Sequence, residues 1–135
     1  MMRLEGIIHS DKGFVICDPA YAMGTKAFYE MCDSDYQSGE REYKGYQVFF
    51  TGCDDGTYHP EEVDGAVEVD SGCFGVVPLE LCSAEYAADL WYGKVIEEAG
   101  DMQYQVMDLA SSIHEDRYKV VVLTLPDGWT IRFFI

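Results

Sequence analysis

Apolar and polar positions follow one another in short runs along this chain, a pattern that predicts strands more often than helices. Residues 4–9 and 13–17 are rich in isoleucine, valine and phenylalanine, and polar turn residues separate them, so they predict an opening β-hairpin. Residues 66–70 alternate apolar and acidic positions, the period of two that is typical of a half-buried strand. A Ser-Gly turn then leads into the apolar run 73–77, so we predict a second hairpin from these two strands.

Further strands are expected where β-branched and aromatic residues cluster, at residues 46–51, 94–97, 102–107, 118–125 and 129–135. A Pro-Asp-Gly sequence predicts a tight turn between the last two of these strands. In the final strand, alternate positions are apolar. We therefore expect Trp129, Ile131 and Phe133 to face the core.

Two short helices are expected to interrupt the strands. Residues 25–31 contain no glycine or proline and have Thr25 as a candidate N-cap, and residues 83–92 begin with a serine and are followed by a glycine. The segments 33–45 and 52–65 are polar and rich in turn residues, so we expect both to be mainly loops.

Hairpins joined by short turns, with two short helices and no long helical crossovers, predict an α+β domain built on a mainly antiparallel sheet. The 135 residues suit a single domain spanning 1–135, and 48% apolar residues are enough for a packed core. No run approaches the roughly 18 apolar residues of a membrane helix, and no basic segment with an apolar core opens the chain. We therefore expect a cytosolic protein without a secretory signal.

The formal net charge is −16, and the excess of acidic residues lies in the middle of the chain, where residues 27–70 contain twelve acidic and two basic residues. Such charge repels nucleic-acid phosphates and anionic membranes and favours a basic protein surface as the partner, although acidity can also serve solubility alone. Exposed tyrosines anchor protein interfaces, and several interleave with these acids. The candidate partner-binding residues are Asp33, Asp35, Tyr36, Glu40, Glu42, Tyr43, Asp54, Asp55, Glu61, Glu62 and Asp64.

Five cysteines and three histidines are scattered without the spacing of a zinc site, so we expect no metal site and no disulfide framework. Cysteines in apolar segments behave as small buried side chains, which we expect for at least three of the five. A nucleophilic cysteine needs a nearby histidine, and Cys17 or Cys53 with His9 or His59 is the pairing to consider. The common hydrolase, nucleotide-binding and metalloprotease motifs do not occur, so we expect no catalytic residue and no cofactor.

Three aspartates, Asp18, Asp55 and Asp70, lie at the ends of predicted strands beside glycine, proline or serine. Strand ends of one sheet can converge, so these carboxylates could line one site that suits a hard cation or a general base. Two of these aspartates, together with two tyrosines, give a candidate ligand rim of Asp18, Tyr21, Tyr58 and Asp70. The interpretation that we favour is simpler, namely that each aspartate caps a turn through its own side chain.

Four short motifs stand out: Asp18-Pro19-Ala20-Tyr21, Cys53-Asp54-Asp55-Gly56-Thr57-Tyr58, Val69-Asp70-Ser71-Gly72 and Gly75-Val76-Val77-Pro78-Leu79-Glu80-Leu81. Together they resemble a pattern of small uncharacterised proteins of bacteriophages and gut bacteria, in which D-P-x-Y is followed by G-D-G-x-Y, V-D-x-G and G-x-V-P-x-E-L. The match covers about the first two thirds of the chain, and Asp54-Asp55-Gly56 departs from the Gly-Asp-Gly of the pattern. The resemblance implies a mobile-element origin and a compact sheet domain, and it implies no reaction.

These observations favour a non-enzymatic inhibitor that acts in the host bacterial cytosol. It would bind a basic, nucleic-acid-binding surface of a defence protein such as a nuclease, with carboxylates in the place of phosphates, in the manner of an anti-CRISPR protein. We expect no direct binding of nucleic acid or membrane. Two alternatives stay open: a protein that sequesters a small molecule or nucleotide signal at the ligand rim, and a metal-assisted hydrolase that uses the three aspartates.

Overall fold

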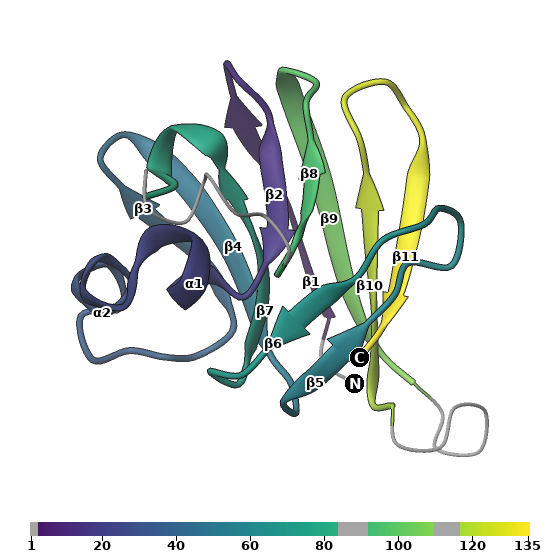
Figure 1. Cartoon of the computed structure of the whole chain (residues 1–135), viewed down its shortest axis with the longest axis horizontal. Helices are drawn as coiled ribbons and strands as arrows, with labels where there is room; N and C mark the ends of the chain where they lie inside the picture. Colours follow the sequence, from purple (N-terminus) through teal and green to yellow (C-terminus); the bar gives the residue numbers. More distant parts are fainter. Residues whose placement is uncertain (1–2, 84–91, 110–116) are drawn as a thin grey trace.

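Two antiparallel β-sheets packed face to face form the centre of the molecule, and the computed structural model describes residues 3–83, 92–109 and 117–135 of it (Figure 1). The first sheet contains, in spatial order, β1 (Arg3–Ser10), β9 (Gly100–Asp108), β10 (Lys119–Thr124) and β11 (Thr130–Phe134). The second sheet contains β3 (Gly39–Tyr43), β4 (Tyr46–Gly52), β7 (Cys73–Pro78), β2 (Phe14–Cys17) and β8 (Lys94–Ile96). A separate two-stranded ribbon pairs β5 (Gly56–Tyr58) with β6 (Val67–Val69).

Two short helices, α1 (Pro19–Met23) and α2 (Thr25–Cys32), cover the face of the second sheet that points away from the first, and a 3-10 turn, η1 (Leu79–Leu81), follows β7. Phe28 of α2 packs with Phe50 of β4 in a core cluster on this side, with the two ring centroids 5.5 Å apart. A second core cluster lies between the sheets, where Phe74 of β7 meets Phe133 of β11 at 5.0 Å. The helices, the second sheet and the first sheet therefore form three layers.

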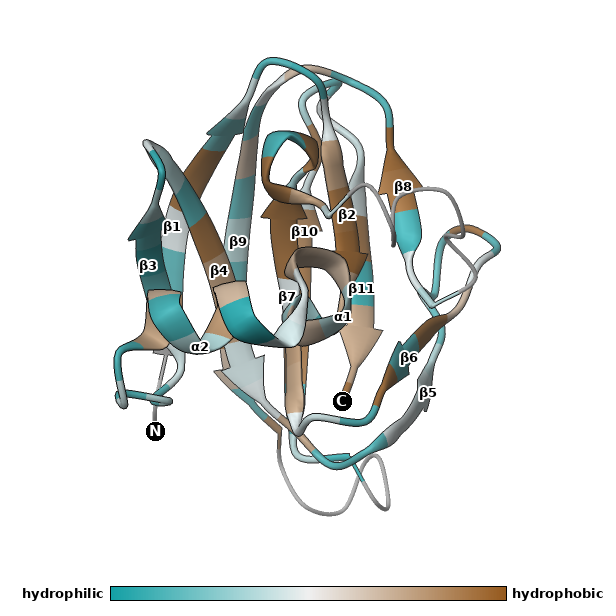
Figure 2. Cartoon of the chain, turned by 60° about the vertical axis from the view of Figure 1, so that its left-hand side comes forward, coloured by the Kyte–Doolittle hydropathy of each residue, from teal (hydrophilic) through white to brown (hydrophobic). Residues whose placement is uncertain are grey.

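This layering explains why two kinds of strand pattern occur in the sequence. β2 and β7 are buried at every position, because the second sheet has helices on one face and the first sheet on the other. In β9 and β11 buried positions alternate with more exposed ones, because one face of the first sheet meets the core. Figure 2 shows the contrast, with β2 apolar along its length and β3 mostly hydrophilic.

The α+β prediction is confirmed in broad terms, but helices are a minor part of a structure that is mostly antiparallel sheet. The predicted strands are present within one or two residues of their expected ends, and β10 and β11 form the predicted terminal hairpin. Within the described residues, no helix has the length and the apolar character that crossing a membrane requires.

Both hairpins predicted in the first half of the chain are wrong. β1 pairs with β9, whereas β2 pairs with β7 and β8, so the first turn carries the chain from one sheet to the other, and the Ser10 hydroxyl accepts the N–H of Gly13 within it. In the same way β6 pairs with β5, while β7 pairs with β2 and β4. The carboxylate of Asp18 accepts the backbone N–H groups of Asp70 and Ser71, which removes both groups from any ladder between β6 and β7.

The prediction that Trp129 belongs to the core is also wrong. Its side chain is 67% exposed, whereas Ile131 and Phe133 are buried as predicted. β11 begins one residue later, and Trp129 belongs to the preceding turn. There its backbone N–H donates to the carboxylate of Asp127 at 2.9 Å. The alternation of buried and exposed positions therefore begins at Thr130 and does not include Trp129.

The remaining differences concern segments between strands. The polar segment 33–45 contains β3, which completes the edge of the second sheet beside β4. The helix predicted at 25–31 is present as α2, but its N-cap is Gly24 rather than Thr25, and α1 was not expected. The helix predicted at 83–92 falls mainly on residues 84–91, outside the described part of the chain.

Candidate functional site

Asp18 is the organising residue of the corner where β2, α1 and the turn after β6 meet. It is fully buried, and it is the N-cap of α1, with one carboxylate oxygen accepting from Ala20 N at 3.0 Å and from the Ser71 hydroxyl at 2.6 Å. The second oxygen accepts from Asp70 N at 3.0 Å and from Ser71 N at 2.8 Å. Four donors therefore take the place of water around this carboxylate, which is how a buried carboxylate is kept in a folded protein.

The other two predicted aspartates lie around the same turn. The Tyr21 hydroxyl of α1 donates to Asp70 Oδ2 at 2.5 Å, and Asp55 Oδ1 accepts from Gly72 N at 3.0 Å. The structure thus brings Asp18, Tyr21 and Asp70 together, with Asp55 on the far side of the turn. Asp18 and Asp55 both bind backbone N–H groups, the capping geometry that the sequence analysis favoured.

Tyr58, the fourth residue of the proposed rim, lies elsewhere. It is buried in the core between the sheets, where its ring meets that of Phe74 edge to face at 6.2 Å, whereas Tyr21 packs on the helix side of the second sheet. Its hydroxyl donates to the carbonyl oxygen of Asp54 at 2.5 Å. Burial, together with the neighbouring thiol of Cys53, raises the pKa of Tyr58 to about 12.

A surface hollow of about 250 Å³ opens beside Asp70, and six residues line it: Ala20, Tyr21, Thr25, Tyr29, Asp70 and Ser71. The Tyr21 ring on its wall stacks on Tyr92 with centroids 5.6 Å apart. This volume accommodates one side chain and is slightly below the roughly 300–1,000 Å³ of sites for drug-sized ligands.

A pair of exposed tyrosines stands next to this hollow. α2 ends at Cys32 because Asp33 and Ser34 adopt left-handed backbone conformations, with φ of 47° and 69°. The chain therefore reverses, and Tyr36 returns to pack edge to face on Tyr29 at 6.0 Å between ring centroids. Tyr29 is 54% and Tyr36 52% exposed, so the pair remains accessible.

Acidic side chains surround this pair. Glu30, Asp33 and Asp35 are exposed, and Asp35 lies 3.4 Å from the guanidinium of Arg41 in a surface ion pair. Figure 2 shows β3 as mostly hydrophilic and α2 with hydrophilic and apolar residues in alternation. We call Tyr29, Glu30, Asp33, Asp35 and Tyr36 the tyrosine face.

Three further candidate residues in this part of the chain have structural contacts. Glu40 of β3 is half-buried and accepts a hydrogen bond from the Tyr104 hydroxyl at 2.5 Å. Burial and, to a smaller extent, this hydrogen bond raise the pKa of Tyr104. Tyr43 is half-buried and donates to Glu30 at 3.0 Å, a hydrogen bond that raises the pKa of Tyr43. Glu42 is exposed and accepts from the backbone N–H two residues beyond β3.

The remaining acidic candidates lie just before β5 and in the loop that follows it. Asp54 and Asp55 precede β5, and Glu61, Glu62 and Asp64 belong to the loop between β5 and β6. That loop runs beside β11, on the side away from α2 and β3 in Figure 1, and Glu62 pairs with Arg132 of β11 at 2.6 Å. The acidic segment 33–64 therefore forms two separate groups rather than one surface.

The cysteine side chains lie in surroundings that favour the protonated thiol over the thiolate. All five thiols are free, and Cys17, Cys32 and Cys73 are buried, as predicted for at least three of them. Burial raises the pKa of Cys17 well above its ordinary value and that of Cys53 to about 12, so both stay protonated.

The histidines of the predicted pairings have other partners. His9 binds the carboxylates of Asp101 and Asp11 at 2.7 and 3.0 Å, and His59 binds the carbonyl oxygen of Gly65 at 2.8 Å. Among the residues that the structure describes, no hydrogen bond joins either histidine to a cysteine. These same residues contain no group of three histidine, cysteine or acidic side chains that could hold a metal ion.

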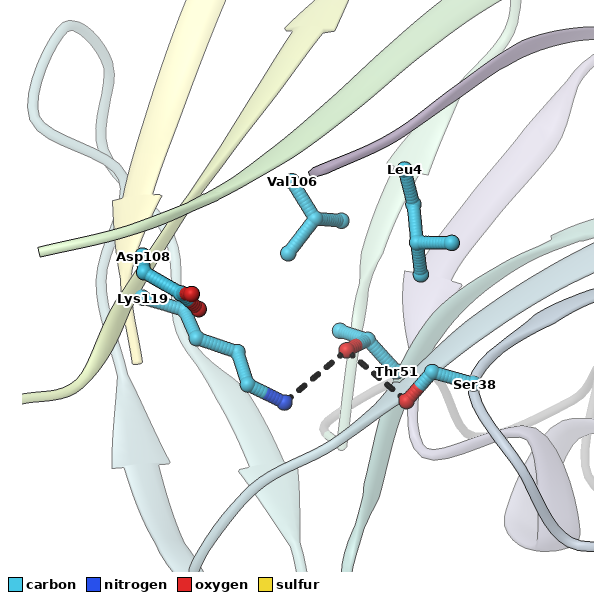
Figure 3. Close-up of a pocket in the computed structure, with 6 residues that line it drawn as sticks. All are labelled: Leu4, Ser38, Thr51, Val106, Asp108 and Lys119. Atoms are coloured by element: carbon cyan, nitrogen blue, oxygen red, sulfur yellow. Dashed lines mark hydrogen bonds between the residues drawn. The ribbon is translucent and has the colours of Figure 1, made fainter. Parts of the chain in front are cut away.

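A second polar hollow lies between the sheets near their ends (Figure 3). The Lys119 ammonium of β10 reaches across to β4, where it donates to Gly52 O at 2.8 Å and to the Thr51 hydroxyl at 3.3 Å, and Thr51 in turn donates to Ser38. The space beside these groups is about 10 Å³, close to what one water molecule occupies. The hydrogen bonds of Lys119 connect the two sheets, and the space beside them is too small for a ligand.

No family model matches this chain, and the comparisons with curated proteins and with solved structures find no match either. The candidate site therefore stands on its own geometry. Sequence reasoning found Tyr36 of the tyrosine face but missed Tyr29, which the sequence analysis placed within a helix without considering its exposure. The signal was available, because Tyr29 lies about 100° around the helix from the buried Phe28 and three residues from the polar Lys26.

Proposed function

We propose that this protein is a non-enzymatic acidic binding protein that contacts a basic surface of a partner protein through the tyrosine face. The observation that carries the proposal is the pair of tyrosine rings, Tyr29 and Tyr36, each more than half exposed and packed against each other among acidic side chains. Tyrosine supplies rigid contact area with little loss of side-chain entropy, and the surrounding carboxylates favour approach of a basic partner.

The net charge of −16 and the resemblance to proteins of mobile elements suggest the kind of partner. We propose a nucleic-acid-binding protein of a bacterial defence system, such as a nuclease, which this protein inhibits in the host cytosol by offering carboxylates where phosphates would bind. Direct contact with nucleic acid or an anionic membrane is disfavoured by the same charge.

The two alternatives receive less support from the geometry. A nucleotide signal is anionic, and the hollow beside Asp70 presents a carboxylate to it. A metal-assisted hydrolase needs carboxylates that are available to a cation, whereas Asp18 and Asp55 bind backbone N–H groups. A protein that binds a basic partner requires neither a pocket for an anionic nucleotide nor a carboxylate cluster that is open to a cation.

Affinity capture from bacterial lysate at low and high salt tests the proposal, with mass spectrometry of what elutes. The double variant Asp33→Asn/Asp35→Asn removes two charges from the tyrosine face, and Glu61→Gln/Asp64→Asn removes two charges from the opposite side as a matched control. We expect the first to weaken capture about three- to tenfold at low salt and the second to change it little. Tyr29→Ala/Tyr36→Ala should abolish capture without lowering the melting temperature. Equal losses in the two charge variants, or full capture by the tyrosine variant, would contradict the proposal.

A further inference from the structure

Two of the hydroxyl groups that line the hollow beside Asp70, those of Tyr21 and Ser71, already donate their protons to carboxylates. The Tyr21 hydroxyl donates its proton to Asp70 Oδ2 at 2.5 Å, and the Ser71 hydroxyl donates to Asp18 Oδ1 at 2.6 Å. Each hydroxyl has a single proton, so both oxygens can present only acceptor lone pairs to a further ligand.

The backbone donors at this turn are committed as well. Asp70 N and Ser71 N both donate to Asp18 Oδ2, at 3.0 and 2.8 Å. Within the described part of the chain, Asp70 Oδ1 accepts no hydrogen bond, so among these residues it can serve as an anionic acceptor. Thr25 and Tyr29 also line the hollow and their hydroxyls can donate or accept, so the Asp70 carboxylate is the group that favours a ligand with a positive charge and N–H donors.

The acceptors are held in place before any ligand arrives. Asp18 is fully buried and fixes the backbone of Asp70, and Tyr21 fixes the orientation of the Asp70 carboxylate. Groups that are already in position lose little entropy on binding. Tyr29 adds an aromatic ring to the lining, and a cation is attracted to such a ring.

Charge around the hollow points in the same direction. Among the described residues that line it, none is basic, and Lys26, the one basic residue of α2, is exposed and lies outside the lining. The chain as a whole carries a net charge of −16, which draws cations toward such a site.

We propose that this hollow receives a single arginine side chain of the partner, with its guanidinium bonded to Asp70 and laid against Tyr29. The inference rests on the proposed function, because Tyr29 belongs both to the hollow and to the tyrosine face. A guanidinium is planar and carries five N–H donors, which matches several acceptors beside an aromatic ring better than the compact ammonium of lysine does.

The test is a titration of the isotope-labelled full chain with capped amino acids, followed by NMR of the backbone amides. The probes are Nα-acetyl-arginine methylamide, the corresponding lysine compound, the neutral citrulline compound, and inorganic phosphate. We expect the arginine probe to give saturable shifts at Thr25, Tyr29, Asp70 and Ser71, with affinity at least about fivefold above that of the lysine probe. The citrulline probe and phosphate should give no saturable shift at these residues.

Two variants complete the experiment. Asp70→Asn should weaken the arginine probe at least about fivefold while the melting temperature stays close to that of the parent, because the backbone bonds to Asp18 do not use this carboxylate. Asp64→Asn removes one charge on the other side and should leave arginine binding unchanged. Equal binding of the citrulline or lysine probe, saturable binding of phosphate at the same amides, or undiminished binding by Asp70→Asn would overturn the inference.

Failure of this inference and failure of the proposed function give different results. Tyr36→Ala should reduce partner capture but leave binding of the arginine probe intact, since Tyr36 does not line the hollow. If the arginine probe does not bind while Tyr36→Ala still loses the partner, the arginine site is wrong and the binding function stands. If the probe binds as expected while Tyr36→Ala captures the partner fully, the tyrosine face is wrong as the partner surface.

Discussion

Replacing Asp18 by alanine should destabilise this protein more than any substitution at the surface. The carboxylate accepts four hydrogen bonds, three of them from the backbone N–H groups of Ala20, Asp70 and Ser71. It also caps α1 and is fully buried. Alanine leaves these three donors without their acceptor and opens a space the size of a carboxylate.

The magnitude follows from the number of orphaned donors. A buried polar group that loses its partner costs about 1–3 kcal/mol, and loss of an N-cap costs about 1 kcal/mol. Water that enters the space will satisfy part of this demand, so we expect a loss of about 4–6 kcal/mol. For a domain of this size that corresponds to a melting temperature lower by about 15–20 °C, and it approaches the total stability of a domain that has about 5–15 kcal/mol.

Calorimetry and urea unfolding of Asp18→Ala and Asp55→Ala measure this effect with an internal control. Asp55 is exposed and accepts one N–H, that of Gly72, so Asp55→Ala should cost no more than about 1.5 kcal/mol. Asp18→Asn keeps the size of the side chain but turns a donor toward N–H groups, so it should lie between the two. If Asp18→Ala melts within a few degrees of the parent, or no lower than Asp55→Ala, the structural role of Asp18 is refuted.

Three other outcomes are expected. Phe133→Ala should cost about 3–5 kcal/mol in urea unfolding because Phe133 is fully buried, whereas Trp129→Ala, at an exposed turn, should change stability by less than about 0.5 kcal/mol. Cys17 and Cys53 should resist a thiol reagent at pH 8 until the chain is unfolded, which absorbance can follow. Because burial raises the pKa of Tyr58 from 10.0 to about 12, the folded state holds this proton more tightly than the unfolded state. Stability measured by urea should therefore fall between about pH 10 and 12, and Tyr58→Phe should reduce that fall.

Strand positions could be predicted from the sequence because each pattern reports how many faces of a strand are buried. The continuous apolar run of residues 73–77 became β7, which is covered on both faces, and the alternation in residues 129–135 became β11, which is covered on one. The hydrophobic pattern of a strand reflects which of its own residues are buried, so it can be recognised from a short stretch of sequence.

Strand pairing was predicted correctly for the terminal hairpin of β10 and β11 but not for the two earlier hairpins, since a turn sequence does not determine which sheet the next strand joins. At the Ser-Gly turn after β6, the N–H groups of Asp70 and Ser71 bind Asp18, which lies more than 50 residues earlier. β7 pairs with β2 and β4 instead of with β6. A contact over that sequence distance leaves no mark in the local hydrophobic pattern.

The candidate site was predictable to a similar extent. Acidity of residues 33–64 can be counted from the sequence, but its division into two groups depends on the β5–β6 loop reaching Arg132 of β11. Exposure of Tyr36 was expected, whereas the neighbouring Tyr43 turned out half-buried because β3 places it beside Glu30 of α2.

The positions of the four motifs that carry the resemblance explain why they occur together in one chain. Asp18 and Tyr21 of the first motif both bind the turn that contains the third, and Asp55 of the second accepts an N–H from the same turn. Glu80 of the fourth accepts from the hydroxyl of Ser10 and from the N–H of the next residue, at the crossing between the two sheets. These side chains form hydrogen bonds with other groups of the same chain.

The contacts of these motif residues can therefore be understood from folding alone. Function then has to be sought in side chains that the motifs do not contain or do not fully occupy. Tyr29 and Tyr36 are of the first kind, since no packing requirement explains two rings that are each more than half exposed. Asp70 is of the second kind, because its contact with the Tyr21 hydroxyl of the corner uses one of its oxygens and the residue also lines the hollow together with Tyr29. The structural corner and the proposed binding surface thus meet at this one carboxylate, which is why Asp70→Asn is expected to change binding while leaving the fold intact.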